Sequence, residues 1–323
     1  MYYYLRYLKK GLGEMNSLSK TISESTGISK VSIKADMIKC ALLYGARPSD
    51  YFFFSFYEKS KWERNRYMTN NRWLKLLKIT QLGGGGLANA KDKEYQLFSS
   101  FIKRDWSLFQ KEKDNTDAIM HFLENHGPCI AKPIHGTLGR GLIKVSKSDD
   151  LSGLKELLRQ DDYLLEECVV NDDEIKRLNP SSLNTFRVFT HVTNDGDVMI
   201  DEIILRVGIA GNVVDNWGAG GIIYYVDIDS GIITKPGIDK HMNTYIIHPG
   251  SDIQMIGYKV KGFEDLKKYV LSLAKVIPDA KVVGWDVAKT QNGFDFIELN
   301  CPGGHDILQA FNTPFWDVFK KLK

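Results

Sequence analysis

The chain has 323 residues, of which 43% are hydrophobic and 26% are charged, and its formal net charge is +3. These values are those of ordinary globular proteins, so they exclude a disordered, collagen-like or low-complexity chain. The length predicts about two domains, and the small net charge gives no reason to expect a nucleic-acid partner.

Positive charge is concentrated in the first quarter of the chain. Residues 1–80 contain 15 lysines and arginines against 6 aspartates and glutamates, a net charge of +9, whereas the remaining residues carry −6. The same segment holds 14 aromatic residues. Such an asymmetry suggests that this segment meets an anionic partner; the alternative is a cap on the next domain with solvated charges.

The four cysteines are scattered and form no CxxC pair. This pattern argues against a zinc site or a disulfide framework and favours a reducing cytoplasm. No apolar run approaches the ~18 residues of a membrane span, and the opening residues lack the apolar core of a signal peptide. We therefore expect a cytoplasmic protein.

Residues 1–80 are expected to be helical. Apolar residues recur at helical spacing over residues 5–12, 31–42 and 72–79. In the second stretch the residues with this spacing are Val31, Ile33, Met37, Ile38, Ala41 and Leu42. Between the second and third stretches lies an aromatic run at residues 51–57. We interpret it as a helix buried against the next domain, because core positions are the commoner use of aromatics; a membrane-surface anchor is the alternative.

Four consecutive glycines within residues 81–90 mark a linker and a domain boundary. No Lys-Ser or Lys-Thr pair follows, so a P-loop is not indicated. Beyond this point helices and strands mix without a regular alternation, which predicts an α+β fold. Helices are expected over 94–109, 117–124, 151–159 and 263–276, and strands over 129–133, 142–145, 163–170, 186–192, 198–207, 222–227, 231–235, 281–289 and 294–299.

The last two expected strands carry acidic residues among apolar neighbours. Glu298 and Asn300 are two residues apart, so both side chains face the same side of a strand. A hairpin brings Asp286 of the preceding strand opposite them. Three oxygen ligands on one sheet face suit Mg²⁺ shared with substrate phosphates; the alternative is a solvated hairpin face.

A second motif places Lys132 at the end of a strand, before a glycine-rich loop with Gly136, Thr137, Gly139 and Gly141. Glycines let backbone N–H groups approach phosphates closely. No helix opens after these glycines, so the loop is not the dinucleotide fingerprint. The lysine precedes the loop, so it is not the protein-kinase arrangement either.

Taken in order, these motifs resemble the ATP-grasp superfamily over about residues 85–323. The resemblance rests on Lys132 with its loop, the segment LEECV at 165–169, and Asp286 followed by Glu298 and Asn300. The segments LNTFRV at 183–188, DN at 215–216, GG at 220–221 and 304–309 resemble the sugar-transfer-associated ATP-grasp family. The spacing of Arg187, Arg206 and Asn216 is also similar to that of ribosomal-protein glutamate ligases.

The resemblance implies an ATP-grasp fold, two α+β subdomains that grip ATP, at residues 81–323. The subdomains would cover about 91–165 and 166–323, behind the helical region 1–80. It also implies residue roles. The ATP phosphates would be bound by Lys93 and Lys132, and adenine by Glu166, Glu167, Cys168 and Val169. One or two Mg²⁺ would be held by Asp286, Glu298 and Asn300. The catalytic residues would be Arg187, Arg206 and Asn216, and His305 and Gln309 would line the acceptor pocket.

Structural alternatives remain for four of these residues. Lys93 could be an ordinary helix-surface lysine, and Arg187 could form an ion pair with Asp201 or Glu202. Glu166 and Glu167 could simply alternate across an edge strand. The remaining histidines show no HxH or HExxH spacing, so zinc is not indicated.

The function implied is an ATP- and Mg²⁺-dependent ligase that joins a carboxylate to an amine through an acylphosphate. The family resemblance places its acceptor in surface-polysaccharide synthesis. The positive charge and the aromatics of residues 1–80 suggest that this region docks on the cytoplasmic membrane face or on a partner that handles lipid-linked sugars, such as a glycosyltransferase; a cap on the ATP-grasp core is the alternative. Two alternatives stay open: a kinase acting on a sugar or another small molecule, and a non-catalytic nucleotide-binding scaffold for glycosyltransferases.

Overall fold

A computed structural model describes residues 2–80, 87, 90–111, 116–135, 141–147, 156, 161–209 and 217–322. The helix expected over 151–159 lies almost entirely outside these residues. The chain divides into two compact units. The first comprises Met1–Thr80, Thr193–Asp195 and Pro302–Lys323, and the second comprises Gln81–Val192 and Gly196–Cys301. The sequence analysis assigned all of 81–323 to one domain, whereas the contacts group the last 22 residues with the first unit.

The first unit is helical, as the periodicity predicts. Its helices are α1 Tyr2–Thr26, α2 Lys30–Tyr44, α3 Pro48–Phe53, α4 Lys61–Arg64, α5 Asn70–Thr80, α11 His305–Leu308 and α12 Trp316–Phe319. Helix α2 begins where the Ser29 side chain accepts a hydrogen bond from the Ser32 amide, and it ends at Gly45, whose φ of 66° suits glycine. None of the helices in the described part of the chain combines the length and apolar character that a membrane span requires.

The aromatic run at residues 51–57 forms part of the core of this unit. Tyr51, Phe52, Phe54 and Phe56 are all buried. The rings of Phe54 and Tyr67 stack with their centroids 5.1 Å apart. Four rings of the run are therefore buried within this unit, and they are not available as a membrane anchor, whereas Phe53 and Tyr57 are half-buried.

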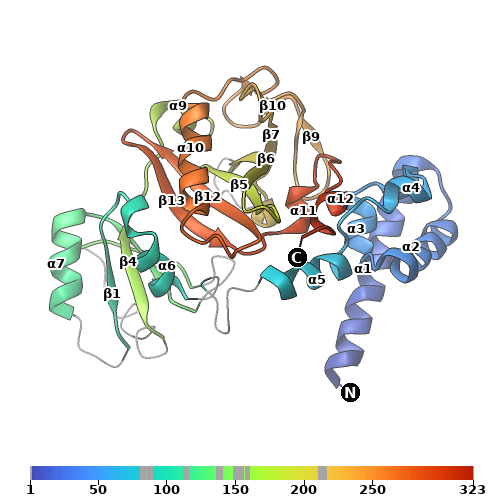
Figure 1. Cartoon of the computed structure of the whole chain (residues 1–323), viewed down its shortest axis with the longest axis horizontal. Coiled ribbons are helices and arrows are strands. Elements are labelled where there is room, and N and C mark those ends of the chain that lie inside the picture. The colour runs from blue at the N-terminus through green and yellow to red at the C-terminus, as the bar shows by residue number, and fades with distance from the viewer. Residues whose placement is uncertain are drawn as a thin grey trace. The chain divides into compact units, whose positions relative to one another are not determined.

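The second unit begins with a small antiparallel sheet in the order β1-β4-β2-β3. Figure 1 shows β1 and β4 of this sheet side by side. Its strands are β1 Trp106–Phe109, β2 Cys129–Pro133, β3 Ile143–Val145 and β4 Tyr163–Glu167. Helix α7, Thr116–His126, packs Ile119 and Leu123 against one face. Helix α6, Lys91–Leu97, places Tyr95 beside Leu164 on the other. The helix expected over 94–109 is therefore wrong in its second half, which is a 3₁₀ turn at Ser99–Phe101 followed by β1.

The rest of the second unit is a seven-stranded antiparallel sheet in the order β13-β12-β5-β6-β7-β8-β9. Its strands are β5 Thr185–Val192, β6 Val198–Val207, β7 Ile222–Val226, β8 Gly237–Ile238, β9 Thr244–Tyr245, β12 Val282–Thr290 and β13 Gly293–Asn300. A separate pair joins β10 Ile247–His248 to β11 Ile253–Gln254, and a short helix, α9, spans Asp173–Lys176. The strand expected over 231–235 is wrong, since Ile232 and Ile233 form isolated bridges only.

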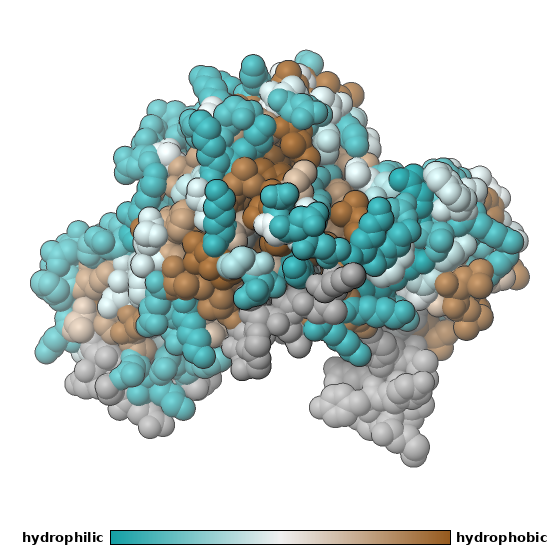
Figure 2. Space-filling view, in the orientation of Figure 1, coloured by the Kyte–Doolittle hydropathy of each residue, from teal (hydrophilic) through white to brown (hydrophobic). Residues whose placement is uncertain are grey.

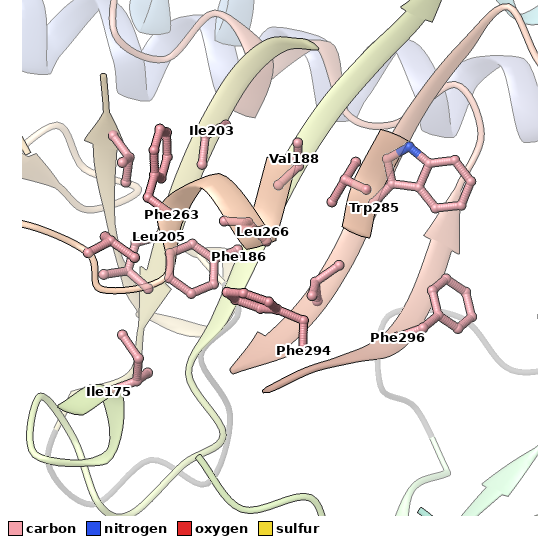
Figure 3. Packing of buried hydrophobic residues seen from close by; sticks show 14 of the residues in the cluster. Ile175, Phe186, Val188, Ile203, Leu205, Phe263, Leu266, Trp285, Phe294 and Phe296 are labelled. Carbon is pink, nitrogen blue, oxygen red and sulfur yellow. The ribbon is translucent and has the colours of Figure 1, made fainter. Parts of the chain in front are cut away.

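One face of the large sheet is covered by α10, Phe263–Ala274. Figure 3 shows Phe263 and Leu266 of this helix among Phe186, Leu205 and Phe294 of the strands, all of them buried. Apolar residues at alternate positions of each strand supply this core, so their neighbours in sequence point to the opposite face. The polar residues Arg187, Arg206 and Asp286 lie at such positions, and the candidate site is built on that face.

Candidate active site

Three charged residues form a row across adjacent strands of the large sheet. Asp286 on β12 is paired directly with Arg187 on β5 and with Glu298 on β13. Directly opposed residues on neighbouring strands place their side chains about 5 Å apart on one face. Asn300, two residues beyond Glu298, lies on the same face, and its Nδ2 is 3.5 Å from Asp286 Oδ2. The structure thus brings together all three residues expected to hold Mg²⁺.

Asp286 is buried between two arginines. The Nε of Arg187 donates to Asp286 Oδ1, and its Nη2 donates to Oδ2 at 2.9 Å. Arg206 Nη2 lies 3.1 Å from the same Oδ2. Burial alone would raise the pKa of Asp286, but the two guanidinium groups outweigh it and hold the pKa below its usual range. The alternative pairing of Arg187 with Asp201 or Glu202 is therefore wrong.

This oxygen-rich set fits a hard divalent cation. Two carboxylates and one amide oxygen are the donors that Mg²⁺ prefers, usually together with substrate phosphates. Glu298 is half-buried, so it is accessible to a ligand. The two arginines beside Asp286 add positive charge where phosphate oxygens would bind, which matches a metal–nucleotide complex better than an isolated metal ion.

The second cluster surrounds Glu166 on the small sheet. Lys132 and Glu166 lie on the same face of β2 and β4 in diagonal register, and Lys132 Nζ is 2.5 Å from Glu166 Oε1. Arg104 Nε donates to Glu166 Oε2 at 2.7 Å, and the Tyr95 hydroxyl also donates to it. Burial would raise the pKa of Glu166, but Arg104 and Lys132 together lower it to about 2.

Arg104 also joins this cluster to the large sheet. Its Nη1 donates to the carbonyl oxygen of Phe296 at 2.8 Å and lies 3.0 Å from Asp295 Oδ1. Its guanidinium is almost completely buried. A buried arginine bonded to both sheets fixes the spacing between them, because an unpaired buried charge is costly.

Helix α6 places Lys91 and Glu94 near Glu298. Glu94 is buried, and its Oε1 accepts a hydrogen bond from the Leu299 amide at 2.7 Å. Burial and the nearby charge of Glu298 raise the pKa of Glu94 to about 8. Burial lowers the pKa of Lys91, while the carboxylates of Glu298 and Glu94 act against that effect. Lys93, the predicted phosphate ligand, is an exposed residue on the same helix.

The segment expected to hold adenine follows Glu166. Glu167 accepts a hydrogen bond from the Asp105 amide at 2.7 Å, and its other oxygen lies 3.2 Å from His126 Nδ1. Both glutamate side chains therefore have protein partners, Glu166 in a buried cluster and Glu167 at a partly exposed position. Cys168 and Val169 are half-buried beyond the end of the strand, so a role in adenine binding would fall to their backbone groups.

Several predicted residues fall outside the described part of the chain. They are Gly136, Thr137, Gly139 and Asn216. Gly141 is described, and its φ of 77° is one that residues with a side chain rarely adopt. A Cβ there would also meet the ring of Pro133 at 3.2 Å. Glycine is therefore required where the loop rejoins β3.

His305 and Gln309, expected near an acceptor, are bonded within the helical unit. His305 Nε2 lies 2.9 Å from Asp50 Oδ1. Gln309 is fully buried, accepts from the Met68 amide at 2.8 Å and donates to the Met68 carbonyl at 2.9 Å. These bonds join the C-terminal segment to the helices of residues 1–80, which accounts for both residues without a substrate.

Sequence reasoning missed Lys91, Glu94, Tyr95 and Arg104. A signal for the first three was available, since positions i, i+3 and i+4 of a helix share one face and Lys93 falls on another. No local pattern distinguishes Arg104, because its partners lie 62 and 191 positions further along the chain.

A family model and several solved structures match this chain. Residues 95–314 match the model of the family described as sugar-transfer associated ATP-grasp. Among solved structures, N5-carboxyaminoimidazole ribonucleotide synthetase in its ADP complex is 13% identical, with a TM-score of 0.45, over 68% of this chain and 45% of that one. The D-Ala:D-Ser ligase VanG from Enterococcus faecalis is 14% identical, with a TM-score of 0.47, over 73% and 60%.

The ATP-grasp ligase PsnB, solved with Mg and ADP, is 14% identical, with a TM-score of 0.44, over 91% of this chain and 74% of that one. The chain spans about half the length of the first of these structures and three fifths of the second. No curated protein matches the chain. Because the family model covers more than half of the sequence, the chain belongs to the sugar-transfer-associated ATP-grasp family.

Proposed function

We propose that the protein is an ATP- and Mg²⁺-dependent ligase that joins a carboxylate to an amine. The observation that carries this proposal is the row formed by Arg187, Asp286 and Glu298, in a chain of ATP-grasp fold. Asp286 and Glu298 of this row can bind a metal ion, and the guanidinium of Arg187 can stabilise the negative charge that develops during the reaction. A structural ion pair alone would not need Glu298 and Asn300 beside it.

The residues of the chain divide into two functional groups. Lys132, together with Lys91 or Lys93, would bind the phosphates by charge-assisted hydrogen bonds. Asp286, Glu298 and Asn300 would hold Mg²⁺, which neutralises phosphate charge when bound. Phosphoryl transfer depends mainly on such positioning and neutralisation.

The reaction then proceeds in two steps. An oxygen of the substrate carboxylate bonds to the γ-phosphorus, and the bond to ADP breaks. The amine nitrogen next attacks the acyl carbon of the resulting acylphosphate, and phosphate leaves as the amide forms. Arg187 and Arg206 would stabilise the negative oxygen of the tetrahedral state, and Asp286 holds both guanidinium groups in place.

The substrate class proposed is that of surface-polysaccharide synthesis: a uronic acid or amino acid joined through an amide. The family's association with sugar transfer supports this choice. We also propose a cytoplasmic protein with a peripheral contact, on the membrane or on a glycosyltransferase, through residues 1–80.

The test is an ADP-release screen in which uronic acids are crossed with amino acids. A ligase releases ADP only when both a carboxylate and an amine are present, and mass spectrometry detects a product lighter than the two substrates by one water. Glu298→Gln serves as the inactive control. ADP release with a hydroxyl compound alone would indicate a kinase, and nucleotide binding without ADP release would indicate a scaffold.

A further inference from the structure

Helix α2 is buried on one side and apolar on the other. The inner side chains of the helix are Ile33, Met37 and Cys40. On the outer side Val31 is 79% exposed, Ile38 is 52% exposed and Leu42 is 82% exposed. The helix therefore carries apolar residues on two sides, and the described part of the chain buries only the inner side.

The exposed residues form a stripe with a regular spacing. Val31, Ala35, Ile38 and Leu42 follow the pattern i, i+4, i+7 and i+11, which aligns side chains along one face of a helix. We call these four residues the α2 stripe. Figure 2 shows a hydrophobic patch on the surface of this part of the helical unit.

Lysines flank the α2 stripe on both sides. At 100° per residue, Lys30 and Lys34 fall along one edge and Lys39 falls along the other. The only acidic residue in the helix, Asp36, lies towards the inner side, where Arg64 pairs with it at 2.8 Å and the Tyr51 hydroxyl donates to it at 2.9 Å. The outer face therefore combines an apolar centre with positive edges and presents no carboxylate of its own.

We propose that the α2 stripe docks on an anionic lipid bilayer, with the helix axis parallel to the membrane surface. A helix in this position inserts its apolar residues at the boundary between headgroups and acyl chains, and its lysines meet lipid phosphates. Pairing two copies through the stripe would instead bring like-charged lysine rows together, which disfavours self-association. Membrane docking through the α2 stripe does not depend on the ligase reaction. It assigns the membrane contact to α2 rather than to the aromatic run at 51–57, most of which is buried.

The test is cosedimentation of the full-length protein with vesicles of phosphatidylcholine alone or with 30% phosphatidylglycerol, at low and high salt. Binding should require the anionic lipid and should weaken as salt is raised, because the Debye length falls to ~3 Å at 1 M salt. Each lysine near an anionic surface contributes about a five-fold gain in affinity. Reversing three lysines should therefore reduce binding by more than ~100-fold. The charge-reversal variant is K30E/K34E/K39E, and the matched control, K147E/K268E/K275E, has the same net charge.

The apolar contribution is tested with V31S/L42S against the control V170S/M199S, which changes exposed apolar residues of the second unit. Only the stripe variant should lose vesicle binding, while circular dichroism shows the same melting temperature for both. Equal loss in the control variants, equal binding to neutral vesicles, or no vesicle binding at low salt would each overturn the proposal. Concentration-dependent dimers abolished by V31S/L42S, without vesicle binding, would show instead that the stripe joins two copies of the chain.

Discussion

Replacing Asp286 should mainly lower the stability of the fold, whereas replacing Glu298 should mainly weaken metal binding. In Asp286→Asn, the guanidinium groups of Arg187 and Arg206 lose the carboxylate that neutralises them, and both side chains are more than nine-tenths buried. Removing one partner of a buried ion pair costs about 3–5 kcal/mol. The asparagine oxygen still accepts one bond, so we expect the lower end of this range.

Glu298→Gln removes the same formal charge from a half-buried position. The substitution also lowers the repulsion that Glu298 exerts on the buried carboxyl of Glu94. We therefore expect its free energy of unfolding to change by less than about 1 kcal/mol. Mg²⁺-dependent nucleotide binding should nevertheless fall by ~10–100-fold or more, because an anionic ligand is lost, and turnover should be abolished.

Urea denaturation and calorimetry separate the two effects. With a slope of ~3 kcal/mol/M, Asp286→Asn should lower the denaturation midpoint by about 1 M, whereas Glu298→Gln should leave it nearly unchanged. Calorimetry with a non-hydrolysable ATP analogue is run with and without Mg²⁺. Turnover of Glu298→Gln at ordinary Mg²⁺ concentrations would refute the metal assignment. An unchanged midpoint for Asp286→Asn would refute the account of its ion pairs.

Three further outcomes are expected. Lys132→Ala should weaken ATP binding at least several-fold, since a hydrogen bond to a charged group is worth about 1.5–3 kcal/mol; unchanged affinity in calorimetry would remove Lys132 from the site. Lys91→Met should weaken nucleotide binding more than Lys93→Met, because Lys91 lies near the carboxylates of Glu298 and Glu94. A larger effect of Lys93→Met would instead favour Lys93, the phosphate ligand predicted from the sequence. Burial raises the pKa of Glu202 to about 8, so the folded state holds this proton more tightly than the unfolded state. Stability should then fall by up to ~1.4 kcal/mol per pH unit as pH rises from Glu202's ordinary range towards 8. Urea denaturation of Glu202→Gln at a series of pH values should not show this fall in stability. The same pH dependence in the variant and in the wild type would contradict the raised pKa of Glu202.

The sequence was sufficient to predict that Asp286 and Glu298 lie opposite each other in a hairpin, because the register of that hairpin is local. The short turn between Thr290 and Gly293 fixes which residues of β12 and β13 oppose each other. Asp286 and Glu298 then meet, even though a bulge interrupts the register next to Asp286. Most strands of the second unit were predicted for the same reason, since alternation within a strand does not depend on its neighbours.

The partners of Arg187 could not be predicted in this way. Asp201 and Glu202, on the strand that follows, were the acids considered for it. The observed pairing depends instead on β12 lying beside β5, and these strands are separated by about ninety residues. The same holds for α2. Its sequence is apolar around most of its circumference, so only the packing of α1 and α3 against it decides which side chains are buried.

The two charged clusters of the second unit follow one physical rule. In each, a buried acid fixes at least two cations: Asp286 holds Arg187 and Arg206, and Glu166 holds Lys132 and Arg104. A flexible lysine or arginine loses side-chain entropy when it is held in one position. If a buried carboxylate already holds the side chain in the folded protein, that entropy is lost during folding, and ligand binding does not have to offset it. On this reasoning we expect Glu166 to position Lys132 rather than to bind adenine directly.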